Sequence, residues 1–140
     1  MIVIKILSVG KTKESWCEEA LAEYQKRLSA VLRIEFQWYK DEQALEQAIA
    51  KEKHILLLDP AGEIVDSLEF TQLLFTHIAA AGSRFAFAIG GPEGFSQKIK
   101  INQRLLSLSK MTFTHQMTRL ILVEQIFRAF EINKGSAYHK

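Results

Sequence analysis

The sequence lacks features that define several large classes of protein. Its 140 residues include one cysteine, Cys17, which excludes an internal disulfide and a metal site built from several cysteines. No segment approaches the ~20 uninterrupted apolar residues of a membrane helix. The amino-terminal segment carries Lys5 inside its apolar run, unlike a signal peptide. We therefore expect a cytoplasmic protein that does not enter a membrane.

The motifs of several enzyme classes are also missing. Gly10-Lys11-Thr12 resembles the end of a phosphate-binding P-loop, but the glycine required five positions before Gly10 is replaced by Lys5. The glycine-rich segment 90–94 does not have the G-x-G-x-x-G spacing of nicotinamide-binding loops, and there is no G-x-S-x-G motif of serine hydrolases. The four histidines are scattered, with no pair at helical spacing, so we predict no metal site.

The overall composition is typical of a globular protein that buries a hydrophobic core. The chain is 48% hydrophobic and 24% charged, and at 140 residues one domain spanning residues 1–140 is expected. Its charge is divided unevenly, because residues 95–140 carry 8 basic and 2 acidic side chains whereas residues 1–94 carry 10 and 14. Such a division arises by chance in a short chain or marks a basic face for a polyanion.

Apolar periodicity indicates strands and helices that alternate along the chain. This alternation predicts an α/β fold with a mainly parallel central sheet and flanking helices. The fully apolar segments 55–58 and 85–89 are expected in the middle of the sheet. Ligands of such sheets bind at the carboxyl ends of the strands. The expected strands are 2–9, 31–39, 55–58 and 84–89, and 105–109 is expected to be a short strand or a loop. The expected helices are 12–30, 41–50, 66–81, a short one after Ser96, and 115–133, with Thr12, Asp66 and Ser96 as N-caps.

The last predicted helix has a wide apolar arc, which includes Leu122, Ile126 and Phe130. Because this arc is wider than one sheet face covers, we expect it to pack against a second subunit. Arg119 falls at the centre of the arc. An arginine on a buried side is costly unless it is paired or meets an anion, so a structural ion pair and an anion-binding role both remain open.

The final third of the chain carries a specific combination of motifs. GGPEG at 90–94 is followed by SLSKMTF-x-HQM-x-R at 107–119, then by RAF and a terminal YHK; SVGK, AEYQKRL and LLLD precede them. Over essentially its whole length, the chain resembles the ribosomal RNA large subunit methyltransferase H family, a branch of the SPOUT methyltransferases. The segment between Lys40 and His54 is shorter than is usual for that family.

The resemblance implies a homodimer with a carboxyl-terminal trefoil knot that binds S-adenosylmethionine and uses no metal. It implies methylation of N3 of a pseudouridine in 23S ribosomal RNA, within the assembled ribosome. By the same resemblance, the cofactor-binding residues are Leu58, Gly90, Leu108, Ser109, Lys110, Met111, Thr112 and Phe113.

The implied reaction requires the imide nitrogen to lose a proton, so a general base or a stabilising cation would help. The candidates, with roles left unassigned, are His139, Tyr138, Arg128, Arg119 and His115. We expect the tail of one subunit to close over the cofactor pocket of the other. Two alternatives are a non-catalytic, flavodoxin-like nucleotide- or phosphate-binding module that uses residues 10–12 and 90–94, and an RNA-binding scaffold without chemistry.

Overall fold

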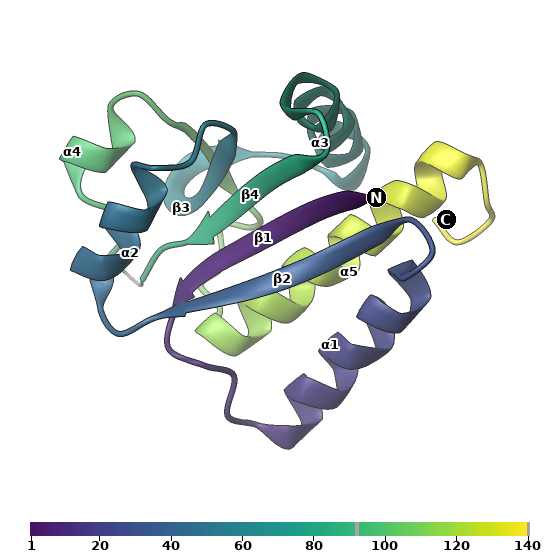
Figure 1. The fold of residues 1–140 in the computed structure, drawn as a ribbon, viewed down its shortest axis with the longest axis horizontal. Coiled ribbons are helices and arrows are strands. Elements are labelled where there is room, and N and C mark those ends of the chain that lie inside the picture. The colour runs from purple at the N-terminus through teal and green to yellow at the C-terminus, as the bar shows by residue number, and fades with distance from the viewer. Residues whose placement is uncertain (92, 140) are drawn as a thin grey trace.

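The protein is an α/β structure of five strands and five helices that alternate along the described chain (Figure 1). The computed structural model describes residues 1–91 and 93–139, so Pro92 of the GGPEG motif and Lys140 of the YHK motif lie outside it. The strands are β1 (Ile2–Val9), β2 (Leu32–Tyr39), β3 (Ile55–Ile64), β4 (Arg84–Ile89) and β5 (Arg104–Ser107); the helices are α1 (Ser15–Leu28), α2 (Glu42–Ile49), α3 (Ser67–Ala81), α4 (Gln97–Lys100) and α5 (His115–Lys134).

The five strands form one sheet in the order β2-β1-β4-β3-β5. All four strand pairings are parallel, which confirms the predicted sheet. β4 is central and β3 is its neighbour, so both apolar segments are interior strands as expected. Because the strands are parallel, all of their carboxyl ends meet at one edge, and the loops that follow β3, β4 and β5 are brought together there.

Helices cover both faces of the sheet (Figure 1). α1, α3 and α5 pack over the face that carries Ile4, Ile6 and Leu56, and this cluster is the larger core. The smaller core on the opposite face joins Leu7 and Leu57 to α2 and to Phe95. Alternate residues of one strand therefore enter different cores, as the two-residue period of a strand requires.

α5 is enclosed within the single chain, and this changes the interpretation of its apolar arc. It contacts α1 on one side and α3 on the other. Phe127 packs against Tyr24 of α1 with ring centroids 5.7 Å apart, and Phe130 packs against Phe75 of α3 at 4.9 Å. The sheet and two helices thus account for the width of the arc, which no longer argues for a second subunit.

Two predicted boundaries are wrong for physical reasons. β3 does not stop at Leu58, because the chain shifts register between Leu58 and Glu63 and then pairs with β5 again through Glu63 and Ile64. α1 begins at Ser15 with Glu14 in the N-cap position, and Thr12 is a buried residue of the preceding turn. By contrast, Asp66 caps α3 as expected, in a reciprocal capping box with Glu69.

Candidate functional site

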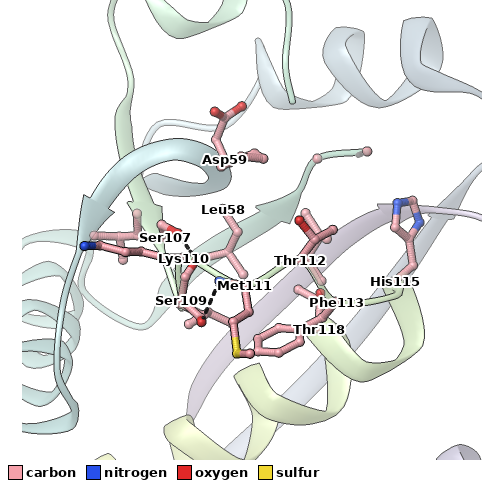
Figure 2. A pocket seen from close by; sticks show the side chains of 16 residues that line it. Leu58, Asp59, Ser107, Ser109, Lys110, Met111, Thr112, Phe113, His115 and Thr118 are labelled. Atoms are coloured by element: carbon pink, nitrogen blue, oxygen red, sulfur yellow. Dashed lines mark hydrogen bonds between the residues drawn. The ribbon is translucent and has the colours of Figure 1, made fainter. Parts of the chain in front are cut away.

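A cavity lies at the carboxyl edge of the sheet, where the ends of β3, β4 and β5 converge (Figure 2). All eight residues that the family resemblance assigned to the cofactor line this cavity. His115, one of the five catalytic candidates, lines it as well. The same wall contains further residues that the resemblance did not assign to the cofactor. Asp59, Pro60 and Gly91 lie in turns after apolar strands, whereas Ile89, Leu106, Ser107 and Thr118 were not expected there.

The loop 108–113 forms one wall of this cavity and is held by short-range hydrogen bonds. Ser107 Oγ donates to the carbonyl oxygen of Ser109 at 2.8 Å, and the Met111 amide donates to Ser109 Oγ at 2.9 Å (Figure 2). Met111 is 76% exposed at the rim. The cavity has a volume of about 110 Å³.

Gly90 packs tightly between two of the segments that build the cavity. Its amide donates to the carbonyl oxygen of Leu58 at 3.1 Å, which continues the β3–β4 ladder. A Cβ atom on Gly90 would lie 3.0 Å from Cε2 of Phe95 and 3.3 Å from the Leu58 oxygen. A side chain at this position would therefore push the Phe95 ring or the strand end out of place.

His115 begins α5 at the far side of the cavity (Figure 2). Its Nε2 atom is buried and has no hydrogen-bond partner within the described residues. Burial lowers the pKa of the imidazole, and the nearby Arg119 guanidinium lowers it further. His115 is therefore neutral at neutral pH and has a nitrogen free to accept or donate a proton, depending on its tautomer.

Arg119 is buried and is hydrogen-bonded to neutral oxygens, in place of the ion pair that was one of the two expectations. Its Nε donates to Ser8 Oγ at 3.1 Å, and its Nη2 donates to the carbonyl oxygens of Val9 at 2.8 Å and Gly10 at 3.0 Å. The guanidinium also lies 4.8 Å from the centroid of the Trp38 ring. Burial lowers its pKa. Arg119 joins α5 to the turn after β1 and is not part of the cavity wall as described.

The remaining candidates gather at the other end of α5, where the tail folds back on the helix. Arg128 Nη2 and the Tyr138 hydroxyl both donate to Glu124 Oε2, at 2.8 and 2.7 Å. Arg128 Nη1 lies 3.0 Å from His139 Nδ1. Burial and the Glu124 carboxylate raise the pKa of Tyr138. None of these residues is among those that line the cavity of the same chain.

A larger hollow of about 650 Å³ lies near the amino end of β1 and the carboxyl end of α5. Phe75, Phe127 and Phe130 form its apolar wall. Ligands of parallel α/β sheets bind at the opposite edge, outside the carboxyl ends of the strands. We therefore place the functional site in the smaller cavity, where the predicted residues converge.

Other kinds of site find no support in the described chain. Across residues 1–91 and 93–139, no three His, Cys, Asp or Glu side chains gather closely enough to hold a metal ion. Cys17 is buried, and burial raises the pKa of its thiol, which disfavours the thiolate. In the part of the chain that the structure describes, no helix combines the length and apolar character needed to cross a bilayer.

Comparisons with known proteins show which family the chain belongs to. The sequence model of a family described as "Predicted SPOUT methyltransferase" matches residues 2–139. The chain is 51% identical over 140 residues to a Protochlamydia amoebophila protein named "Ribosomal RNA large subunit methyltransferase H", with 100% of each covered. A Bacillus cereus protein of the same name is 40% identical over 157 aligned positions, which cover 98% of this chain and 99% of that protein. Because this alignment is longer than the chain, the Bacillus cereus protein carries segments that the chain lacks.

One solved structure shares the fold. It is described as the structure of a probable methylase family protein from Haemophilus influenzae Rd KW20, and it superimposes with a TM-score of 0.56 at 10% sequence identity. The match covers 94% of this chain and 66% of that chain.

Proposed function

This chain belongs to the SPOUT methyltransferase family, and from that premise we propose that it methylates N3 of a pseudouridine in 23S ribosomal RNA of the assembled ribosome, with S-adenosylmethionine as methyl donor. The observation that carries the proposal is the convergence of all eight expected cofactor residues on one cavity. Residues 1–140 act as one methyltransferase domain in the cytoplasm, where ribosomes are found.

The lining of the cavity fits a nucleoside-type donor. Apolar side chains of Leu58, Leu106 and Phe113 offer contacts for an adenine ring, and backbone groups at the strand ends offer hydrogen bonds. S-adenosylmethionine supplies a methyl group on a positively charged sulfur. Transfer in line to a nitrogen mainly requires the two reactants to be aligned, which contributes ~7–11 kcal/mol through effective concentration.

Two groups of residues are candidates for removing the proton from the imide nitrogen or for stabilising the anion that results. His115 is the candidate base on the cavity side, because it borders the cavity and its buried Nε2 has no hydrogen-bond partner among the described residues. Burial lowers the pKa of its imidazole, which keeps it neutral but makes it a weaker base than a free imidazole. The tail offers His139 and Tyr138 beside Arg128. The hydrogen bond to Glu124 raises the pKa of the Arg128 guanidinium, so Arg128 stays charged. Its charge would stabilise the negative charge on a deprotonated pseudouridine ring.

A homodimer would bring these two groups together. Within one chain the tail lies on α5, apart from the cavity wall. We propose that the tail of one subunit completes the cavity of the other, and that residues 108–113 belong to the trefoil knot characteristic of SPOUT methyltransferases. The convergence of residues that follow β3, β4 and β5 on one cavity supports this arrangement.

The flavodoxin-like alternative loses the first of its two proposed binding segments, residues 10–12. In the turn after β1, the carbonyl oxygens of Val9 and Gly10 accept hydrogen bonds from Arg119. Thr12 Oγ1 is 3.4 Å from the same guanidinium. The turn is therefore filled by a side chain of its own protein, which favours the methyltransferase over a phosphate-binding module.

Ligand-dependent unfolding tests the donor, and methyl incorporation tests the acceptor. We expect S-adenosylhomocysteine at one hundred times its Kd to stabilise the protein by ~2.7 kcal/mol, whereas flavin mononucleotide and ATP have no effect. Ribosomes from a strain that lacks the modification should incorporate labelled methyl at one pseudouridine. Stabilisation by flavin mononucleotide alone would refute the donor. Unlabelled ribosomes despite cofactor binding would refute the acceptor and favour the scaffold without chemistry.

A further inference from the structure

Asp59 is a buried carboxylate that joins three segments around the cavity. It directly follows Leu58 in β3, and its side chain is 1% exposed. Oδ1 accepts a hydrogen bond from the Ala61 amide at 2.9 Å, and Oδ2 accepts one from the Phe95 amide at 2.7 Å. Lys100 Nζ of α4 lies 3.4 Å from Oδ1. One carboxylate thus links β3, the end of the glycine-rich loop and α4.

These contacts satisfy a charge that would otherwise be expensive to bury. An isolated buried carboxylate is strongly disfavoured, and two amide donors and one ammonium group compensate this one. Hydrogen bonds to a charged acceptor are shorter and stronger than neutral ones, which agrees with the 2.7 Å separation from the Phe95 amide. The Phe95 backbone is therefore held at a defined position relative to the end of β3.

The position of Phe95 in turn fixes both ends of the glycine-rich loop. At its start, the Phe95 ring borders Gly90, where a Cβ would lie 3.0 Å from ring atom Cε2. At its end, Gly94 has a φ of +79°, and a Cβ there would lie 2.6 Å from Asp59 Oδ2. Asp59 therefore contacts Gly94, where the positive φ and the close carboxylate both favour glycine. Through the Phe95 amide it also positions the ring that packs against Gly90.

We propose that Asp59 is a positioning residue for the cofactor, which holds Gly90 and Gly94 in place through its contacts with Phe95 and Gly94 and does not act on the reacting atoms. In Figure 2 its carboxylate points away from Ser109, Met111 and Thr112. Lys100 is its charge partner, with Nζ 3.4 Å from Oδ1. This inference rests on the proposed methyltransferase function, because it concerns the shape of the same cavity.

The test compares Asp59→Asn and Asp59→Ala with a control of similar instability. Asp66→Ala removes the N-cap of α3, away from the cavity, and lowers stability without touching the loop. We expect Asp59→Asn and Asp59→Ala to raise the Kd for S-adenosylhomocysteine and the KM for S-adenosylmethionine by about tenfold or more. kcat at saturating donor stays near the wild-type value. Asp66→Ala lowers the melting temperature but leaves Kd and KM unchanged.

A charge-partner variant separates positioning from simple stability. Asp59→Asn leaves the Lys100 ammonium without its partner, so adding Lys100→Met should recover melting temperature. It should not recover cofactor affinity, because the Phe95 amide still lacks its charged acceptor. The amide proton of Phe95 reports this bond directly, and its NMR resonance should move upfield in Asp59→Asn.

The outcomes of the two proposals can be distinguished. Wild-type protein that does not bind S-adenosylhomocysteine would refute the proposed function itself. Wild-type binding together with an unchanged Kd in Asp59→Asn would refute the positioning role and leave the function intact. An equal loss of affinity in Asp66→Ala would also overturn the role, since the effect would then follow from lower stability alone. If Asp59→Ala fails to fold, Asp59→Asn and the Phe95 resonance decide the question.

Discussion

Arg119 Nη2 donates a hydrogen bond to the carbonyl oxygen of Val9 over 2.8 Å, and this bond ties the last helix to the end of the first strand. The two residues are 110 positions apart in the chain. Bonds to Ser8 and Gly10 reinforce the link, and all of the partners are neutral. The positive charge is thus stabilised by oriented backbone and hydroxyl dipoles, in a place where an ion pair was one of two expectations.

Replacing Arg119 should therefore lower the free energy of unfolding. Arg119→Met leaves the Val9 and Gly10 oxygens without these donors, and we expect a loss of about 3 kcal/mol in the free energy of unfolding. Urea unfolding followed by circular dichroism measures it. Arg104→Met is the matched control, because Arg104 is about half exposed, and it should change stability by less than about 0.5 kcal/mol. Equal stability of Arg119→Met and wild type would show that the buried bonds contribute nothing.

Gly90→Val should impair the donor site directly. The new side chain meets the Phe95 ring and the Leu58 oxygen, and overpacking of this kind costs about 1–3 kcal/mol. We expect the Kd for S-adenosylhomocysteine, measured by titration calorimetry, to rise by about tenfold to a hundredfold. Gly82→Ala is the control, because Gly82 also has a positive φ of 74° but no atom near its Cβ direction. If Gly90→Val binds as tightly as Gly82→Ala, the cavity is not the donor site.

The sequence was sufficient for what depends on local pattern. The apolar periodicity correctly predicted β4 and α5, and the polar residue before the third helix correctly predicted its Asp66 cap. Motif matching placed the eight cavity residues, because strand ends in a parallel sheet converge on one edge.

Contacts between distant segments were not accessible from the same pattern. The Asp59–Phe95 bond spans 36 positions, and the Arg119–Ser8 bond spans 111. The first depends on how β3 lies beside the segment after β4, and the second on how α5 packs against β1. Neither arrangement is encoded in a local sequence period. The continuation of β3 beyond Leu58 was not predicted, because Asp59-Pro60-Ala61-Gly62 has the composition of a turn. A local bend there is real, but pairing with β5 continues the strand.

Two histidines predict how stability depends on pH. Burial lowers the pKa of His115 and of His77 below the ordinary value of 6.5. The unfolded chain therefore binds more protons than the folded chain as the pH falls below 6.5, and the free energy of unfolding must decrease in that window. We expect His115→Gln to flatten this decrease, as measured by urea unfolding between about pH 5 and 7. His77→Gln should add to the effect. A variant curve parallel to that of the wild type would contradict the burial of the His115 ring.

Deletion of the tail should separate turnover from donor binding. Removing residues 138–140 leaves the described cavity wall intact, because Tyr138 and His139 pack on α5 and not in that wall. We expect methyl transfer to ribosomes to fall by about a hundredfold or more, with an unchanged Kd for S-adenosylhomocysteine. Lys134→Gln changes an exposed charge at the same end of α5 and should leave both quantities unchanged.

Mixing the two impaired chains, at a donor concentration near the wild-type Kd and so below that of Gly90→Val, then tests whether the tail acts across subunits. The tail-deleted chain retains a donor cavity, and the Gly90→Val chain retains a tail. If the tail of one subunit completes the cavity of its partner, a mixed dimer contains one complete site. Random exchange of subunits makes about half of the dimers mixed, so about a quarter of the wild-type activity should return. A tail that serves its own cavity restores nothing on mixing, because every chain in the mixture then lacks either the cavity or the tail.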